Sequence, residues 1–376
     1  MSRISPASIG YFAPMPPVRS GVADYAAALQ SWIPTARLNR SGAINLYQLG
    51  NNVLHKDIYA RALSEPGVAL LHDAVLQHFF LSTLSEEAYV EEFVYNYGEW
   101  SRDLGGSLWR NRARSGVDVR YFDYPMLRGI CEASRAVIVH NPAAAAIVEA
   151  HAGGRTEPLS VHEVPHLFAT PPLPAGYEIV RLRDTLGVGP RTFVFAVFGY
   201  LRESKRISSI LRAFARIRES VDAVLLIAGD FVSDELARAC DPMLNHPGIL
   251  RVGHLCEEDF WRYAAACDAC LNLRYPAAGE TSGIGVRLMG IGKPVLFSSG
   301  SEIERIPAAA CVRIDSGVAE IDMLSEMMQW LARFPAHARE IGRLGAEHIA
   351  LYHQPRRCAE SVIAACESAL EQTTCA

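Results

Sequence analysis

The sequence lacks several features that would assign it to a class at once. It has no run of about 18 apolar residues, so no segment is expected to span a membrane, and attachment to a membrane surface stays open. The amino terminus has no basic segment followed by an apolar one, so no signal peptide is predicted. Lys and Arg never form a run of five, and the formal net charge is −5, which argues against non-specific binding of nucleic acid.

The cysteines follow no pattern of disulfides or metal ligands. There are nine of them, an odd number, and most lie among apolar residues, which is typical of reduced thiols in the cytosol. Cys267 and Cys270 form a C-x-x-C pair without a second pair at zinc spacing, which favours core packing over a metal. Asp73 and Asp230 stand alone, so no acidic pair for Mg²⁺ is evident either. We predict no metal site.

Length and patterning predict two domains. The chain has 376 residues, of which 50% are hydrophobic, enough for two cores. Apolar strands alternate with amphipathic helices in both halves, which predicts parallel sheets covered on both faces. We expect strands at 8–13, 44–49, 68–71, 136–139 and 161–164, and again at 193–198, 223–228, 249–252, 269–273 and 295–297.

A proline-rich segment at 169–174 marks the expected linker between the domains. A last helix, at 357–371, is expected to cross back to the first domain. The predicted divisions are therefore 1–172, 173–352 and a crossing segment at 353–376.

The stretch 272–296 contains the most informative loop. A strand end leads into a Pro/Gly loop with one carboxylate, Glu280, and a helix should begin near Thr281 or Ser282 and end at 292–294. Free N–H groups and the helix dipole at such a start bind anions. A carboxylate there would instead accept hydrogen bonds from hydroxyls, which abound in sugars. The alternative is an ordinary turn with a surface carboxylate.

Basic residues follow the strand expected at 193–198. The segment reads Gly199-Tyr200-Leu201-Arg202-Glu203-Ser204-Lys205-Arg206. Its three cations, together with a helix start near residue 281, suit a diphosphate and would stabilise a departing phosphate oxygen without a metal. Surface salt bridges are the alternative for Lys205 and Arg206.

Polar residues also follow three strands of the first half. The pair Ser20-Gly21 lies in a proline-rich loop after the first strand, and Asp24 falls in the first turn of the next helix. Asn51 follows the second strand, and the pair His72-Asp73 follows the third. Open α/β sheets bind ligands at the carboxyl ends of their strands, so we expect His72 to contact a ligand. A histidine that caps or packs against the next helix is the alternative.

Residues 85–109 are aromatic, and a basic segment follows them. The aromatic residues predict mainly core packing, with part of an acceptor cleft or a membrane-facing surface as alternatives. In the simplest interpretation the basic segment is a solvated face. In a more specific interpretation it binds a phosphate-bearing acceptor. The aromatic residues are Tyr89, Phe93, Tyr95, Tyr97 and Trp100, and the basic ones are Arg110, Arg112, Arg114 and Arg120.

In this order, these motifs resemble those of retaining, GT-B-type glycosyltransferases that use nucleotide sugars, and especially a family 4-like lineage of polysaccharide and O-antigen mannosyltransferases. The resemblance covers nearly the whole chain. It lies in the loop at 14–24, in His72, in residues 199–206, and most specifically in 279–283 with 292–294. The implied fold class is α/β, GT-B, with two Rossmann-like domains that face each other across a cleft.

The resemblance implies roles for individual residues. His72 would contact the donor sugar, Glu280 would hold sugar hydroxyls, and Lys205 with Arg202 would bind the diphosphate, and these four are the catalytic candidates. Further donor-side candidates are Ser20, Gly21, Gly199, Arg206, Thr281, Ser282 and Gly283. The acceptor-side candidates are Asp24, Asn51 and Asp73.

The implied reaction transfers a hexose, with mannose from GDP-mannose as the leading guess, to a hydroxyl of a glycan or lipid-linked saccharide during polysaccharide assembly. We expect no cofactor, no metal and no nucleic acid partner. The enzyme would be cytoplasmic, in peripheral contact with the inner face of the membrane. The leaving diphosphate would take the acceptor proton on the same face, so the anomeric configuration would be retained.

Two departures from the family pattern stand out. The second glutamate, eight residues after the first, is Leu288 here, so ribose recognition must differ. The usual Gly-Arg is Gly199-Tyr200, for which Arg202 would substitute. Leu288 keeps open an alternative, a catalytically silent subunit that binds a glycan or a partner enzyme. A nucleotide-sugar epimerase on the same fold is another.

Overall fold

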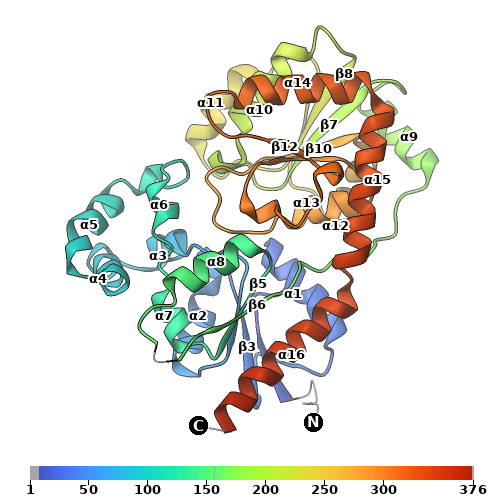
Figure 1. Cartoon of the computed structure of the whole chain (residues 1–376). Helices are drawn as coiled ribbons and strands as arrows, with labels where there is room; N and C mark the ends of the chain where they lie inside the picture. Colours follow the sequence, from blue (N-terminus) through green and yellow to red (C-terminus); the bar gives the residue numbers. More distant parts are fainter. Residues whose placement is uncertain (1–7, 156, 375–376) are drawn as a thin grey trace. The chain divides into compact units, whose positions relative to one another are not determined.

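The computed structural model describes residues 8–155 and 157–374 of the chain. The chain forms two compact units (Figure 1). Unit 1 comprises Met1–Ala169, Pro276–Thr281 and His353–Ala376, and unit 2 comprises Thr170–Tyr275 and Ser282–Tyr352. The first division falls at the start of the proline-rich segment, and the last segment groups with unit 1.

Each unit is built on a six-stranded sheet whose order is β2-β1-β3-β4-β5-β6 in unit 1 and β12-β11-β10-β7-β8-β9 in unit 2. All neighbouring strands are parallel. The order reverses between β1 and β3 and between β7 and β10, which is the doubly wound arrangement of a Rossmann-like fold. The strands are β1 Ile9–Phe12, β2 Arg37–Leu38, β3 Ile44–Leu49, β4 Val68–Leu71, β5 Ala136–Val139, β6 Ser160–Glu163, β7 Phe193–Phe198, β8 Ala223–Ala228, β9 Ile249–Val252, β10 Ala269–Asn272, β11 Val295–Ser298 and β12 Val312–Ile314.

Helices connect the strands in both units. In unit 1 they are α1 Gly21–Trp32, α2 Lys56–Ser64, α3 Gln77–Thr83, α4 Glu86–Tyr97, α5 Arg102–Arg110, α6 Arg120–Asp123, α7 Arg128–Ala133, α8 Pro142–His151 and α16 Pro355–Thr374. In unit 2 they are α9 Gly176–Thr185, α10 Ile207–Ile217, α11 Asp234–Leu244, α12 Glu257–Ala266, α13 Gly283–Gly290, α14 Glu320–Arg333 and α15 Pro335–Tyr352. The expected strands are confirmed, whereas β2, β12 and α11 were not expected.

Both faces of the unit 1 sheet are buried. Successive side chains of a strand point to opposite faces, so Leu46 enters one core and Tyr47 the other. The core around Leu46 is completed by α1 and by α16, which contributes Val362 and Cys366. In Figure 1, α16 runs in red beside the strands of this unit. The continuously apolar strands are therefore explained by a sheet with helices on both sides.

The sheet of unit 2 is also packed on both faces. Phe195 of β7 enters a core that includes Phe214 of α10 and Leu324 of α14. On the other face, the ring of Phe198 lies 5.2 Å from that of Phe260 in α12, measured between centroids. The strands of this sheet are therefore held by packing on both faces, and the basic segment follows the end of β7.

Helices α4 to α7 form the aromatic and basic part of unit 1. Tyr89 and Phe93 are fully buried, which confirms the core interpretation for these two residues. Trp100 is 69% exposed, so the aromatic stretch is not all core. The arginines that follow are mostly partnered at the surface: Arg120, for example, pairs with Asp118 at 2.6 Å.

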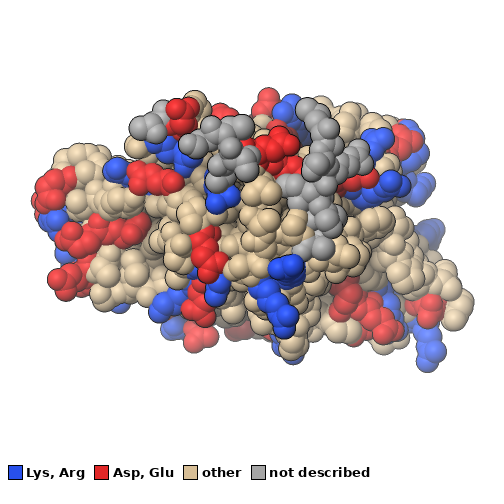
Figure 2. Space-filling view, turned by 90° about the horizontal axis from the view of Figure 1, so that it is seen from below, with Lys and Arg blue, Asp and Glu red and all other residues tan. Residues whose placement is uncertain are grey.

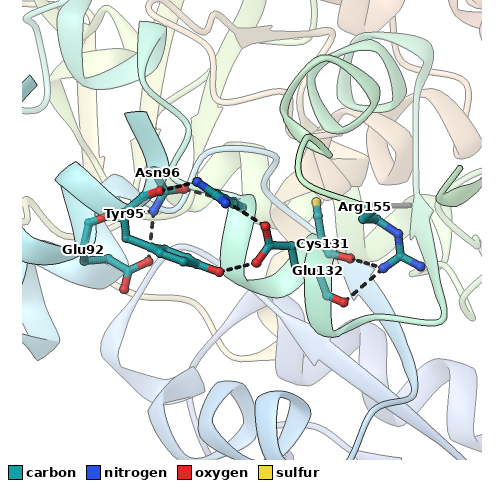
Figure 3. Close-up of polar contacts among 7 residues, drawn as sticks. Glu92, Tyr95, Asn96, Cys131, Glu132 and Arg155 are labelled. Atoms are coloured by element: carbon teal, nitrogen blue, oxygen red, sulfur yellow. Dashed lines mark hydrogen bonds and ion pairs between the residues drawn. The ribbon is translucent and has the colours of Figure 1, made fainter. Parts of the chain in front are cut away.

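A polar network ties α4 to α7 (Figure 3). The Tyr95 hydroxyl donates to the Glu132 carboxylate, which also accepts from Arg128 Nε at 2.7 Å. Arg155, after α8, donates to the carbonyl oxygens of Cys131 at 2.7 Å and Ser134 at 2.9 Å. These bonds satisfy carbonyl groups at the end of α7 and fix the outer helices on the sheet.

The surface carries charges of both signs. Figure 2 shows one face on which Lys and Arg side chains are interspersed with Asp and Glu rather than gathered in one basic stripe. Interspersed charges give a weak long-range field on that face.

Candidate functional site

The basic segment of unit 2 follows β7, one of the two strands at which the sheet order reverses. Gly199 has a φ of +79°, a backbone conformation that favours glycine. A Cβ atom on Gly199 would lie 2.8 Å from Ile284 Cδ1 and 3.2 Å from Lys205 Nζ. The Lys205 ammonium and the first turn of α13 therefore both approach Gly199. Ligands of doubly wound sheets bind at this reversal point.

Lys205 is a buried cation without a carboxylate. Its side chain is 7% exposed, and Nζ donates to Phe198 O at 2.6 Å. Among the residues that the structure describes, no Asp or Glu pairs with it. Burial lowers the pKa of Lys205 well below its ordinary value, and the nearby guanidinium groups of Arg274 and Arg202 lower it further. Such a group lacks an anion, and an anionic ligand would stabilise its charge.

Arg202 and Arg206 differ in their surroundings. Arg202 is exposed, and no other described residue forms a hydrogen bond or ion pair with its side chain. Arg206 Nε instead donates to both oxygens of Glu320 at 2.9 and 3.0 Å, and this carboxylate is 1% exposed. Arg202 is therefore available to a ligand, whereas Arg206 ties its loop to the start of α14. This salt bridge is the alternative that the sequence left open for Arg206.

Helix α13 begins after Ser282, which confirms the expected helix start. The Ser282 hydroxyl accepts from Gly285 N at 3.2 Å and donates to Asn272 Oδ1 at 3.1 Å. The N–H groups of Gly283 and Ile284 precede the first intrahelical bond and have no acceptor among the described residues. Asn272 Nδ2, in the same region, is buried and has no hydrogen-bond partner within the described part of the chain. This helix start thus offers several donors to an anion.

The loop Pro276–Thr281, which lies within the predicted division 173–352, groups with unit 1. Ala74 N donates to Ala278 O at 2.8 Å. Asn141 Nδ2 donates to Gly279 O at 2.8 Å and to Thr281 Oγ1 at 2.9 Å, while its Oδ1 caps α8. These bonds hold the loop on unit 1. The sequence interpretation assigned no role to Asn141, although its place at a strand end was a signal.

Glu280 lies in this loop, and one of its carboxylate oxygens is engaged by the backbone of the loop. Its Oε2 accepts a hydrogen bond from Ala278 N at 2.6 Å. Gly279 has a φ of +70°, and a Cβ there would lie 2.9 Å from Ala74 Cβ. The loop therefore needs glycine for both conformation and space. Thr281, one of the predicted donor contacts, has its hydroxyl engaged by Asn141.

The first strand of unit 1 leads to Ser20, which caps α1. Its hydroxyl accepts from Val22 N at 3.2 Å and Ala23 N at 3.4 Å. Gly21 is exposed, and nothing lies within 4 Å of a Cβ placed on it. Asp24 is exposed in the first turn of the helix. The Ser20 hydroxyl is therefore engaged as the helix cap, and Gly21 and Asp24 are exposed beside it.

Asn51 and Asp73, two of the acceptor-side candidates, are joined by a hydrogen bond. Asp73 Oδ2 accepts from Asn51 N at 2.8 Å. The Asn51 side chain is itself engaged, since Oδ1 accepts from Phe79 N at 2.8 Å and Nδ2 lies 3.1 Å from His78 Nδ1. The side-chain amide of Asn51 therefore orders the start of α3. If Asn51 binds an acceptor, it must do so while it keeps these hydrogen bonds.

His72 lies in a cluster of rings at the strand ends of unit 1. The Tyr25 ring has its centroid 4.8 Å from that of His72, 5.0 Å from that of His140 and 4.7 Å from that of His166. Burial lowers the pKa of His72 well below its ordinary value, and His140, His166 and His55 lower it further. Burial lowers the pKa of His140 to about 4, although the bond to Val164 O opposes this. His72 is therefore neutral near pH 7.

The sequence interpretation missed the other rings of this cluster and one buried amide. Gln48 is fully buried in β3, and its Oε1 lies 2.8 Å from His72 Nε2. A glutamine inside a buried, largely apolar strand was the available signal, because buried polar groups need partners.

Among the described residues, no group of three or more His, Cys, Asp or Glu side chains is arranged to hold a metal ion. None of the helices in the described part of the chain has the length and apolar character needed to cross a membrane.

Comparison with solved structures finds proteins of similar fold, whereas no family model and no curated sequence matches the chain. HepE of Anabaena in complex with UDP-glucose superposes with a TM-score of 0.64 at 16% identity, covering 96% of this chain and 99% of that one. WaaG, a glycosyltransferase involved in lipopolysaccharide biosynthesis, gives 0.60 at 13% identity, covering 94% and 98%. Sucrose-phosphate synthase from Thermosynechococcus elongatus gives 0.58 at 15% identity, covering 84% and 71%. The fold is GT-B, with two Rossmann-like domains.

Proposed function

We propose that this GT-B protein is a glycosyltransferase that takes its sugar from a nucleotide donor. The observation that carries the proposal is Lys205, a buried ammonium that has no carboxylate partner among the described residues and lies beside the N–H donors at the start of α13. Burying an unpaired charge is costly, so a fold keeps one where a ligand supplies the counter-charge. A diphosphate has the charge and the acceptor oxygens to fill this place. The GT-B fold, shared with a protein solved with UDP-glucose, agrees with such a donor.

In the proposed reaction, the bond between the anomeric carbon and the phosphate oxygen breaks, and a new bond to the acceptor oxygen forms. The acceptor proton moves to the departing diphosphate on the same face of the sugar, so the configuration is retained. Lys205, Arg202 and the N–H groups of α13 would neutralise the charge that grows on the diphosphate. His72 would contact the donor sugar and Glu280 its hydroxyls, with the acceptor on unit 1 near Asp24 and Asp73.

The finer assignments belong to the same proposal. The sugar is a hexose, with mannose from GDP-mannose first in line from the resemblance of the motifs, and UDP-glucose second because HepE binds it. The acceptor is a glycan or lipid-linked saccharide of polysaccharide assembly, met at the cytoplasmic face of a membrane. The cations already present would make a divalent metal unnecessary, so turnover should survive EDTA.

A thermal-shift screen of GDP-, UDP-, ADP- and dTDP-sugars tests the donor, because a ligand that binds the folded state raises its melting temperature. We expect one nucleotide sugar to stabilise the protein and its diphosphate to be released only when an acceptor is present. Conversion of the donor to its epimer without an acceptor would identify an epimerase. Silence toward every donor would overturn the proposal in favour of a non-catalytic subunit.

A further inference from the structure

We propose that Gln48 and Tyr11 are positioning residues that hold His72 as a neutral imidazole protonated on Nε2, so that its Nδ1 accepts a hydrogen bond from a ligand hydroxyl. The part that concerns the ligand rests on the proposed function. The part that concerns the ring rests on unit 1 alone.

The three side chains form one chain of hydrogen bonds across adjacent strands. Tyr11 of β1 donates its hydroxyl proton to Ala26 O in α1 at 2.8 Å. Gln48 of β3 donates from Nε2 to the Tyr11 oxygen. Gln48 Oε1 lies 2.8 Å from Nε2 of His72, which follows β4. Strands β1, β3 and β4 are neighbours in the sheet, so the chain runs straight across it.

The direction of every bond in this chain follows from one fixed acceptor. A carbonyl oxygen can only accept, so the Tyr11 hydroxyl must donate to Ala26 O. The Tyr11 oxygen can then only accept, and the amide nitrogen of Gln48 must face it. Gln48 Oε1 is left to face His72, and His72 Nε2 must therefore carry the proton. If the Gln48 amide were flipped, its Oε1 would face the Tyr11 oxygen. The bond to Tyr11 would be lost, because lone pairs of the two oxygens would then face each other.

Burial makes this direction difficult to change. Tyr11 and Gln48 are both 0% exposed, so water cannot replace a lost partner. Leaving one buried amide group unsatisfied costs about 1–3 kcal/mol. The rings of Tyr25 and His140 lie 4.8 and 5.1 Å from that of His72 between centroids and hold its plane.

Two other buried histidines provide an internal contrast. His55 Nδ1 lies 3.0 Å from Gln48 O, and His140 Nδ1 lies 2.8 Å from Val164 O. Both carbonyl groups require a donor, so both rings carry their proton on Nδ1. The same part of unit 1 thus holds one ring in one tautomer and two rings in the other.

The tautomer of His72 decides what it can recognise. With the proton on Nε2, Nδ1 has a lone pair and can only accept. A phosphate oxygen cannot supply a proton there at neutral pH, whereas a sugar hydroxyl can. His72 would therefore select a hydroxyl group of the ligand, and the diphosphate would be left to the cations of unit 2.

Long-range ¹H–¹⁵N spectra of the full chain, labelled on histidine, test the ring directly. We expect the His72 pattern of an Nε2-protonated ring at pH 7.5, and the opposite pattern for His55 and His140. Gln48→Leu should let the two tautomers of His72 interconvert and average in the spectrum. Tyr47→Phe is the control: it removes a hydroxyl on β3 that bonds to Glu65 O and not to Gln48, and it should leave the His72 pattern unchanged. A His72 ring protonated on Nδ1, or unchanged in Gln48→Leu, overturns the proposal.

Two further measurements keep the proposal testable if Gln48→Leu folds poorly. Tyr11→Phe removes the acceptor that orients Gln48 and should also loosen the His72 tautomer. Gln48→Glu places a carboxylate against Nε2 and should raise the pKa of His72 in an NMR titration, with a matching shift in the acid limb of the kcat/KM profile. An unchanged His72 pKa in Gln48→Glu counts against the proposal.

Addition of the best nucleotide sugar separates the two claims. A shift of the His72 Nδ1 resonance toward that of a hydrogen-bonded acceptor supports both. A fixed tautomer without any shift leaves the positioning intact and counts against the ligand contact. Binding of the nucleotide sugar to a chain whose His72 carries its proton on Nδ1 counts against the positioning alone.

Discussion

Replacing Lys205 with methionine tests the diphosphate site most directly. Methionine retains the length and apolar character of the side chain and removes the ammonium group. Within the described residues, that group donates only to Phe198 O, at 2.6 Å. The substitution therefore removes the charge offered to a ligand while it disturbs little of the protein.

The structure sets the size of the expected effect. A hydrogen bond to a charged group contributes about 1.5–3 kcal/mol. Since 1.4 kcal/mol corresponds to about a tenfold change in affinity, Lys205→Met should weaken binding of the nucleoside diphosphate by about 10- to 100-fold. Replacing a buried, poorly compensated charge by an apolar group is commonly neutral or stabilising, so the free energy of unfolding should stay equal or rise by about 1 kcal/mol.

Calorimetry with the nucleoside diphosphate of the best donor, at fixed ionic strength, measures the first effect, and urea denaturation the second. Lys293→Met is the matched control, because Lys293 Nζ donates to Ala265 O at 2.8 Å and Cys267 O at 2.6 Å, past the other end of α13. It should lose stability and keep its affinity. Equal diphosphate binding by Lys205→Met and the parent would refute the assignment of Lys205.

Three further outcomes are expected. Arg206→Ala leaves the buried Glu320 carboxylate unpaired and should lower the free energy of unfolding by about 3–5 kcal/mol, with donor affinity retained in calorimetry. Unfolding in urea should become easier as pH falls from about 6.5 to 4, since burial lowers the pKa of His55 and of His140 to about 4 and the unfolded chain takes up their protons first. Asn141→Ala should speed hydrogen exchange in residues 276–281, as it removes two bonds to that loop.

Each of these outcomes has a control. Arg202→Ala should show the reverse of Arg206→Ala, with weaker donor binding and unchanged stability, because its side chain has no described partner. His55→Leu should reduce the change in the free energy of unfolding between these pH values by about 3 kcal/mol, because the pKa shift of about 2.5 corresponds to 1.36 kcal/mol per pKa unit. An unchanged pH dependence of the unfolding free energy would contradict the buried-histidine argument. Ser85→Ala removes only the cap of α4 and should not affect exchange in 276–281.

The arrangement of strands could be predicted because buried parallel strands have a simple signature. Segments such as 193–198 and 223–228 are apolar at every position and end at glycine. The missed elements lack that signature. Strand β2 has two exposed residues, β12 carries Arg313 at its centre, and α11 contains Pro242, a residue that argues against helix.

Site features that depend on neighbours in sequence were predictable, and those that depend on distant partners were not. Ser282 could be recognised as a cap because capping involves the next three residues. The partner of Arg206 lies 114 residues away, and Gln48 lies 24 residues from His72 on a neighbouring strand. Only the sheet order and packing bring such pairs together, and one sequence does not contain that information.

The position of Leu288 bears on how a donor would be held. The glycosyltransferase family that the sequence resembles has a carboxylate at this position, which holds the ribose. In this chain the position is Leu288, whose side chain is 0% exposed within α13. A glutamate at such a position would bury an unpaired charge, so this position offers no carboxylate to the ribose of the proposed donor. In the proposed complex, more of the binding free energy would then come from the diphosphate, through Lys205, Arg202 and the start of α13. Donor affinity should accordingly depend strongly on ionic strength, because charge pairs with the diphosphate rather than ribose contacts would dominate it.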